Sequence, residues 1–198
     1  MTKILFATGN VHKVDEARQI LGPDYEVVTP AQLGWDGDIP ETHPTIAGNS
    51  LQKAQFVWDK FHLPCFSDDT GLEVDALGGA PGVYSARYAG EDKSPADNRA
   101  KLLKELEGIP YEKRTAHFSC VVTYIDEKGQ AEQYEGRCEG HIAMDESDGE
   151  QGFGYDKIFV ADEYGVPMAE VTMDQKSAIS HRGKALRAFQ CHLQKNRG

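Results

Sequence analysis

Apolar runs and amphipathic segments alternate through the first quarter of the chain. Residues 3–8 (KILFAT) form a mostly apolar run, typical of a buried strand, which a glycine and an asparagine end. Apolar residues then recur at helical spacing over residues 11–21, and a Gly-Pro pair follows, so we predict a helix that stops there. Residues 25–28 predict a short strand, and residues 29–45, which include three prolines, predict a long loop.

The middle of the chain predicts two more helices around a polar segment. Apolar positions over residues 51–61 mark a second amphipathic helix. Residues 63–67 predict a short strand that runs into a polar turn, and the glycine-rich residues 73–90 predict irregular structure. Residues 95–106 predict a helix, with Ser94 as its N-cap and a proline at its first position.

A hairpin and a final helix complete the pattern. Apolar residues alternate with polar or small ones over residues 116–124, which predicts a half-buried strand. Residues 126–129 predict a turn, and residues 132–138 predict the returning strand. Residues 158–160 are a short apolar segment, and residues 185–193 show helical spacing. This order predicts an α/β fold with a mixed sheet rather than a strict βαβ repeat.

Composition refines this picture mainly through charge. The chain has 198 residues, which suits one domain over residues 1–198, and its formal net charge is −11. Proteins that bind long nucleic acids or anionic membranes normally present a basic face, so the acidic balance argues against both partners. It still allows a small polyanion to bind in a local basic pocket together with a metal ion.

The cysteines and the N-terminus favour a cytoplasmic protein. No two of the four cysteines lie at CxxC spacing, so we expect ordinary reduced thiols. The opening MTKILFAT becomes polar too early for a signal peptide, and no apolar run approaches the length of about 18 residues that a membrane span needs.

Two segments combine lysines with positions that suit phosphate. From Thr8 to Lys13 a strand ends in a glycine turn and opens a helix, whose free N–H groups and dipole favour an anion; Asn10 would be the N-cap. Lys53 shares a face of the second predicted helix with an asparagine four residues earlier, so it can meet the same phosphate. Glu41 lies in the preceding loop and can reach a metal ion.

Two adjacent carboxylates, Asp68 and Asp69, follow the strand predicted over residues 63–67. Strand ends in α/β sheets are where ligands bind. One carboxylate can hold Mg²⁺ while its neighbour accepts a proton from attacking water. Two close carboxylates also raise the pKa of one of them, which suits a general base.

Two later segments offer groups that can recognise a base. Glycines flank Phe153, so a flat ligand can approach and stack on its ring, while Asp156 can bond the ligand's edge. Lys176, His181 and Arg182 supply donors near the start of the last helix. The planar fork of Arg182 matches a keto oxygen and a ring nitrogen, which favours 6-oxopurines over adenine. Each of these segments alone also suits ordinary surface or core positions, but together they meet the needs of a nucleotide hydrolase.

Four segments, TGNVHK, SDDTGLEVDALGGAPGVYSARYAG, GFGYD and KSAISHRG, occur in this order and spacing. Together they resemble the inosine/xanthosine triphosphate pyrophosphatases, the Ham1-like family. The resemblance extends from residue 3 to about residue 193. It implies an elongated, two-lobed α/β fold with a long mixed sheet flanked by helices, and an active site in the cleft between the lobes.

The resemblance also implies a reaction and its setting. Water attacks the α-phosphorus of inosine or xanthine triphosphates, in ribo or deoxyribo form, and releases the monophosphate and pyrophosphate with Mg²⁺ as the cofactor. The implied role is to clear deaminated purines from the nucleotide pool. Bacterial members are usually homodimers, so a homodimer is expected here.

Position by position, the resemblance assigns roles to residues of this chain. Asp69 matches the proton acceptor and metal ligand, with Asp68 as its helper. Lys53 matches a phosphate lysine that acts in catalysis, and Glu41 matches a second metal ligand. The substrate-binding positions are Thr8, Gly9, Asn10, Val11, His12, Lys13, Thr70, Phe153, Gly154, Tyr155, Asp156, Lys176, His181 and Arg182.

Three positions depart from the family pattern. Gly48 stands where a glutamate is common, and Lys157 stands where a proline is common. Residues 43–47 (HPTIA) replace a loop that usually contains glycine. These departures bear on local geometry and on the strength of metal binding.

Two other functions stay open at the level of sequence. The first is a related pyrophosphatase of the Maf-like type that acts on modified pyrimidines. The second is a nucleotide-binding regulatory protein without catalysis, which would not need a general base at Asp69.

Overall fold

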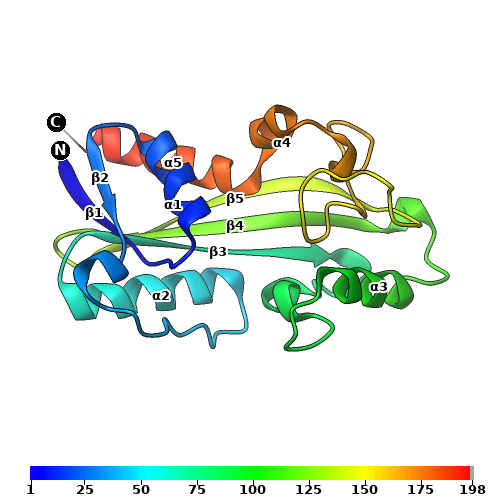
Figure 1. Ribbon diagram of the computed structural model, residues 1–198, viewed down its shortest axis with the longest axis horizontal. Helices are drawn as coiled ribbons and strands as arrows, with labels where there is room; N and C mark the ends of the chain where they lie inside the picture. The colour runs from blue at the N-terminus through cyan, green and yellow to red at the C-terminus, as the bar shows by residue number, and fades with distance from the viewer. Residues whose placement is uncertain (197–198) are drawn as a thin grey trace. The chain divides into compact units, whose positions relative to one another are not determined.

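A mixed six-stranded sheet organises the part of the chain described by the computed structural model, residues 1–196 (Figure 1). The strands lie in the order β2-β1-β3-β4-β5-β6. Strand β1 is parallel to β2 and β3, whereas β6 is antiparallel to β5. The predicted α/β class is therefore confirmed.

The strands are β1 (Thr2–Phe6), β2 (Tyr25–Val28), β3 (Cys65–Val74), β4 (Thr115–Ile125), β5 (Ala131–Ile142) and β6 (Phe159–Ala161). The helices are α1 (Val11–Leu21), α2 (Ile46–Phe61), α3 (Pro95–Glu105), α4 (Met173–Ile179) and α5 (His181–Lys195).

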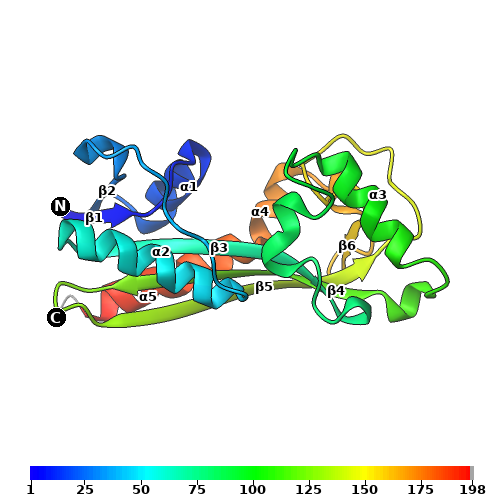
Figure 2. The same cartoon turned by 90° about the horizontal axis from the view of Figure 1, so that it is seen from below.

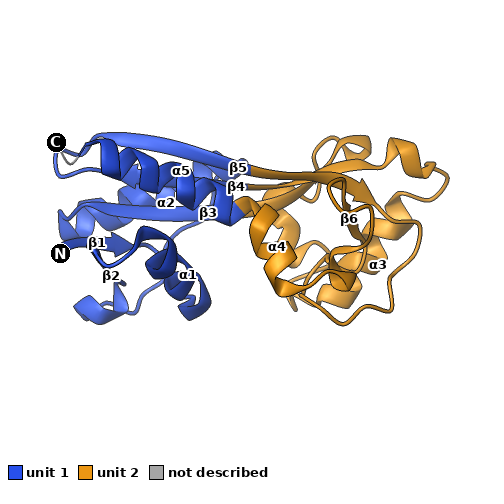
Figure 3. Ribbon diagram, turned by 90° about the horizontal axis from the view of Figure 1, so that it is seen from above, with its two compact units in different colours: residues 1–69, 120–136, 182–198 blue, residues 70–119, 137–181 orange. Residues whose placement is uncertain are grey.

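The chain divides into two compact units, coloured separately in Figure 3. Unit 1 comprises residues 1–69, residues 120–136 and those from 182 onward, and unit 2 comprises residues 70–119 and 137–181. The division falls within β3, β4 and β5, so each of these strands contributes residues to both units.

Helices cover both faces of the strands in unit 1. Helices α1 and α5 pack on one face, where Val14 and Phe189 join a core with Phe66 of β3. Helix α2 packs on the other face, where Ala54 and Val57 join a second core. Figures 1 and 2 show α2 on the side of the strands opposite to α1 and α5. Strand β3 therefore has a helical layer on each side within this unit.

Unit 2 has a hydrophobic core of its own. Leu102 of α3 and Ile179 of α4 pack in one cluster with Leu72 of β3 and Phe159 of β6. These side chains are buried, with exposed fractions of 4% or less. Removal of this apolar surface from water stabilises the unit independently of any ligand.

Local capping signals set the ends of the predicted helices. The side chain of Asn10 accepts hydrogen bonds from two backbone N–H groups at the start of α1, and Gly22 is the C-cap residue. Ser94 caps α3 as predicted: its hydroxyl accepts from the backbone N–H of Asp97 at 3.2 Å. The helices predicted over residues 11–21 and 95–106 are therefore confirmed.

Two local predictions are wrong. The polar turn expected after residue 67 does not form, because β3 continues as a strand to Val74. Paired cations neutralise Asp68 and Asp69, and the apolar pattern resumes at Leu72. Lys176 does not open the last helix: it lies on the separate helix α4, and α5 begins after Ser180.

The four cysteines are free thiols, as the sequence predicts. Cys65, Cys120 and Cys138 are buried, and Cys191 is exposed. Burial raises the pKa of Cys65 to about 12, so its reactive thiolate form is suppressed. None of the helices within residues 1–196 is both long and apolar enough to cross a membrane.

Candidate active site

The turn between β1 and α1 presents a pre-formed helix start. The Asn10 side-chain oxygen accepts from the backbone N–H groups of His12 and Lys13 at 3.0 and 3.3 Å, and the Thr8 hydroxyl accepts from the backbone N–H of Asn10 at 3.1 Å. Gly9 and Val11 complete the segment, and the Val11 side chain is exposed. These bonds satisfy backbone N–H groups at the helix start and fix the local backbone.

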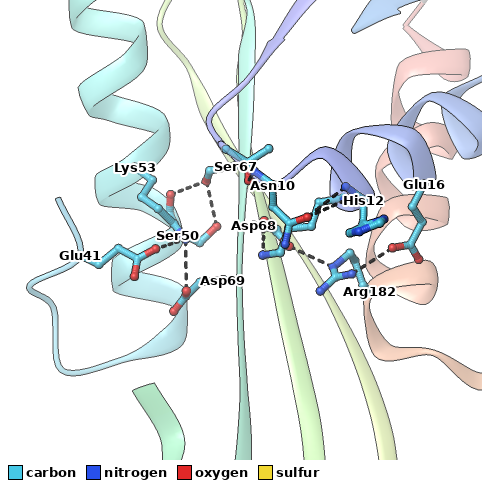
Figure 4. A network of polar contacts seen from close by, with 12 residues as sticks. Asn10, His12, Glu16, Glu41, Ser50, Lys53, Ser67, Asp68, Asp69 and Arg182 are labelled. Atoms are coloured by element: carbon cyan, nitrogen blue, oxygen red, sulfur yellow. Dashed lines mark hydrogen bonds and ion pairs between the residues drawn. The ribbon is translucent and has the colours of Figure 1, made fainter. Parts of the chain in front are cut away.

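Asp68 and Asp69 point to opposite faces of β3, because successive side chains of a strand alternate. Asp68 meets Lys13 of α1 and Arg182 of α5, whereas Asp69 meets Lys53 of α2 (Figure 4). The close carboxylate pair predicted from the sequence therefore does not form. The cause is the extended strand, since a turn at this point would have allowed both carboxylates to face one site.

Asp68 is a buried counter-ion for two cations. Its oxygens lie 2.9 Å from the Lys13 ammonium and 3.2 Å from Nε of Arg182, and its side chain is 2% exposed. Burial alone would raise the pKa of Asp68, but the attraction of Lys13, Arg182 and Lys53 outweighs it and lowers the pKa to about 2. Asp68 is therefore ionised throughout the neutral range and is poorly suited to accept a proton.

Asp69 has the opposite electrostatic setting. Burial raises its pKa, the nearby Glu41 adds to this effect, and the attraction of Lys53 only partly counteracts it. The net shift is upward, which makes this carboxylate a better proton acceptor than an exposed aspartate. The pKa of Lys53 is also raised, because Asp69, Asp68 and Glu41 outweigh the effect of its burial.

Helix α2 holds the loop that carries Glu41. Gln52 accepts from the backbone N–H of Thr42 at 2.8 Å and donates to the Thr42 hydroxyl at 2.8 Å. Asn49 accepts from the backbone N–H of His43 at 2.8 Å. Glu41 is thereby held beside α2, where its carboxylate lies 2.7 Å from the Lys53 ammonium.

Glu41 and Asp69 have the donor chemistry that suits Mg²⁺. This ion prefers oxygen ligands and usually takes one or two carboxylates together with substrate phosphates and water. The ammonium of Lys53 contacts both carboxylates, at 2.7 Å from Glu41 and 3.2 Å from Asp69, so this position already accommodates a positive charge. Within residues 1–196, His, Cys, Asp and Glu side chains form no group of three or more that could hold a metal ion.

The departures at Gly48 and at residues 43–47 are physically linked. A Cβ atom at Gly48 would lie 2.5 Å from Nδ1 of His43 and 2.8 Å from the hydroxyl of Thr45, closer than real contacts allow. The Thr45 hydroxyl accepts from the backbone N–H of Gly48 and caps α2. The side chains of His43 and Thr45 therefore occupy the space that the side chain of a larger residue at position 48 would need.

In unit 2, Phe153, Asp156 and Lys176 lie together. The Phe153 ring is 81% exposed, and the Lys176 ammonium lies 5.0 Å from its centre. Asp156 accepts from the backbone N–H of Phe153 at 2.9 Å and pairs with Lys176. A depression of about 190 Å³ is lined by this loop and by Pro95 and Arg99 of α3. An exposed ring held by a fixed loop is suited to stacking on a flat ligand.

The other residues of this loop support its shape. The Tyr155 hydroxyl donates to the Ser85 carbonyl at 2.6 Å, and Tyr155 is buried. Tyr155 therefore anchors the loop to the interior of unit 2. The Gly154 carbonyl accepts from Arg99 at 2.8 Å, and Gly154 has a φ of +63° that favours glycine. Gly152 also has a positive φ, of +75°.

The remaining predicted site residues are divided between the two units. His181 belongs to unit 2 and stacks on Phe118, with ring centres 5.1 Å apart. Thr70 is the first residue of unit 2 and is half-buried. Arg182 belongs to unit 1 and donates to Glu16 at 3.0 Å as well as to Asp68.

Three residues of these clusters are missing from the sequence predictions. Glu16 lies three positions after Lys13 on α1, so helical spacing is a signal that could have found it. Arg99 and Phe118 give no local signal, because their partners, Gly154 and His181, lie 55 or more positions away in the chain.

Comparison with known proteins gives consistent results. Residues 4–192 match the Ham1 family. The chain is 46% identical over 194 residues to a protein of Thermoanaerobacter sp. (strain X514) named dITP/XTP pyrophosphatase, covering 98% of this chain and 97% of that one. It is 44% identical to a Bacillus subtilis (strain 168) protein of the same name, with 94% of each chain covered. The structure of the Staphylococcus aureus Ham1 protein matches with a TM-score of 0.93 at 36% identity, covering 99% of this chain and 100% of that one.

Proposed function

The chain belongs to the Ham1 family, and on that premise we propose that it hydrolyses triphosphates of deaminated purines, in ribo or deoxyribo form, to monophosphate and pyrophosphate. The substrates are inosine and xanthine triphosphates, and their hydrolysis removes them from the pool of nucleoside triphosphates. The observation that carries this proposal is Asp69, a half-buried carboxylate of raised pKa whose oxygen lies 3.2 Å from the Lys53 ammonium.

The proposed chemistry uses the groups of unit 1. Asp69 accepts the proton of the water that attacks the α-phosphorus, and the bond between the α-phosphorus and the bridging oxygen breaks as pyrophosphate leaves. Lys13 and Lys53 compensate the negative charge that grows on the pyrophosphate. Asp68 holds Lys13 and Arg182 in place without exchanging a proton, because its pKa lies far below neutral pH.

Glu41 and Asp69 would hold the divalent cation that this chemistry requires, and we propose Mg²⁺. The bound ion supplies positive charge to the phosphate oxygens. Support comes from the oxygen donors of these two side chains and from the lysine ammonium already placed between them.

We assign recognition of the base to the loop of unit 2 around Phe153. Phe153 stacks on the purine, while Asp156, Lys176 and His181 supply polar contacts to its edge. Support comes from the exposure of the Phe153 ring and from the pairing of Asp156 with Lys176. Arg182 stays a proposed base reader, although it donates to the carboxylates of Asp68 and Glu16.

Phe153→Ala is expected to raise KM for inosine triphosphate about tenfold and to change kcat little. Stacking on an aromatic side chain contributes roughly 1–3 kcal/mol per base, and the exposed ring is not part of the core. Tyr111→Ala is the matched control, because Tyr111 is a partly exposed aromatic residue of unit 2 outside the loop. Steady-state kinetics on both variants measure the effect. An unchanged KM for Phe153→Ala would remove Phe153 from the binding site.

A nucleotide panel tests the proposed function directly. With Mg²⁺ present, inosine and xanthine triphosphates should release pyrophosphate, and adenosine triphosphate should be nearly inert. Release of orthophosphate instead would move the cleaved bond and refute attack at the α-phosphorus. Turnover of modified pyrimidine triphosphates alone would favour the Maf-like alternative, and binding without any turnover would favour a regulatory protein.

Several further properties complete the proposal. Residues 1–198 form one Ham1-like domain that assembles as a homodimer in the cytoplasm. Its partner is a small nucleotide rather than a nucleic acid polymer or a membrane, which agrees with the net charge of −11. Four free cysteines agree with a reducing compartment.

A further inference from the structure

The cations of the unit 1 cluster are all paired with carboxylates (Figure 4). Three positive side chains face four negative ones, which leaves an excess of one negative charge. The cluster therefore does not attract a triphosphate by net charge, and the positive charge that binding requires must arrive with the nucleotide. The cations are Lys13, Lys53 and Arg182, and the carboxylates are Glu16, Glu41, Asp68 and Asp69.

Lys53 has a special position in this cluster. Its ammonium contacts Glu41 at 2.7 Å and Asp69 at 3.2 Å, the two carboxylates proposed to hold a divalent cation. The Lys53 side chain is 7% exposed, so water screens its charge poorly. A divalent cation on the same oxygens would lie close to this ammonium, and like charges at such separation repel strongly.

The two aspartates differ in how firmly they are neutralised. Asp68 has two partners, one of which is the planar guanidinium of Arg182. Asp69 has the single ammonium of Lys53, a compact charge on a flexible stem that can move to a new partner. The ion pairs of Asp69 and Glu41 are therefore the ones that can be exchanged.

We infer that Lys53 is an exchangeable counter-ion. It neutralises Glu41 and Asp69 while the nucleotide is absent, and it transfers to the phosphates when a nucleotide brings a divalent cation to these carboxylates. The inference rests on the proposed metal-dependent function and deepens it, since it makes the metal–nucleotide complex, rather than the free ion, the species that the protein binds.

Binding of Mn²⁺ alone, without nucleotide, tests this inference. The free ion is measured by electron paramagnetic resonance during titration of the full-length protein. Lys53→Met replaces the ammonium with an apolar group of similar length, so the two carboxylates become available. We expect it to bind Mn²⁺ at least about tenfold more tightly than the wild type, equivalent to about 1.4 kcal/mol.

Two control variants separate exchange from a general effect of charge. Lys13→Met makes the same change of charge beside Asp68, and its Mn²⁺ affinity should change less than about threefold. Lys53→Arg keeps a cation at the site and should bind Mn²⁺ as weakly as the wild type. Thermal unfolding checks that each variant folds, and Lys53→Gln replaces Lys53→Met if that variant does not.

Either of two results would overturn the inference. Mn²⁺ affinity of Lys53→Met equal to that of the wild type would mean that Lys53 does not compete with the cation. An equal gain for Lys13→Met would mean that only the overall charge matters. Neither measurement uses turnover, so a failed nucleotide panel with a positive Mn²⁺ result would refute the proposed function alone.

Discussion

Asp69→Asn is expected to lower kcat about 100-fold or more. Asparagine has nearly the same shape but cannot accept the proton of the attacking water, and general-base catalysis typically contributes 10²–10⁴-fold in rate. The raised pKa of Asp69 makes it the better acceptor of the two adjacent carboxylates. Initial rates of pyrophosphate release from inosine triphosphate measure the effect.

Asp75→Asn is the control for this prediction. Asp75 lies six positions further along the same segment, and its carboxylate accepts from the Thr115 hydroxyl at 2.6 Å. It should keep turnover close to that of the wild type. Near-normal turnover in Asp69→Asn would refute the assignment of Asp69 as the base. Separate measurement of nucleotide binding shows whether a loss of rate reflects chemistry or affinity.

Asp68→Asn is expected to destabilise the protein by about 2–3 kcal/mol. Removal of one partner of a buried ion pair costs roughly 3–5 kcal/mol, and the partial exposure of Lys13 and Arg182, 19% and 20%, reduces this figure. For a chain of this size, Tm should fall by roughly 5–10 °C. Thermal unfolding at neutral pH measures the change. Asp15→Asn is the control, because Asp15 forms only an exposed pair with Arg18 and should change Tm little.

The pH dependence gives the same prediction a second check. The pKa of Asp68 is lowered from 3.8 to about 2 in the folded protein, so its stabilising contribution is complete above pH 3.8 and is lost as the pH falls through 2. This shift corresponds to about 2 kcal/mol. The difference in stability between the wild type and Asp68→Asn should therefore shrink between pH 4 and pH 2. A constant difference would mean that the pKa of Asp68 is not lowered in the folded protein.

Local signals explain why most elements could be predicted from the sequence. Helix α1 begins after Asn10 and ends before Gly22 because capping depends on residues within one turn. Helix α4 was not predicted, although it carries an equally local signal, a capping box in which the side chains of Thr172 and Gln175 each accept from the other's backbone N–H. The short strand over residues 25–28 also matches β2. Such features need no knowledge of distant residues.

Strand β3 was beyond this kind of prediction. Its polar run from Ser67 to Gly71 has the composition of a turn, but cations brought to it by α1, α2 and α5 neutralise its two aspartates within the extended strand. Arg182 lies 114 positions from Asp68 and 166 positions from Glu16. Sequence could therefore predict many members of the site, but not which side chains pair.

The alternation along β3 also determines which changes in chain length the site can tolerate. Insertion of one residue just before Ser67 would shift the strand by one position, leaving an aspartate on the face towards α2 but a serine facing Lys13 and Arg182. Deletion at the same place would leave an aspartate beside these two cations but put Thr70 where the proton acceptor belongs. The first change keeps a proton acceptor but leaves the two cations without their counter-ion, and the second keeps the counter-ion but removes the proton acceptor. The register of β3 is thus as strongly constrained as the identity of its two aspartates.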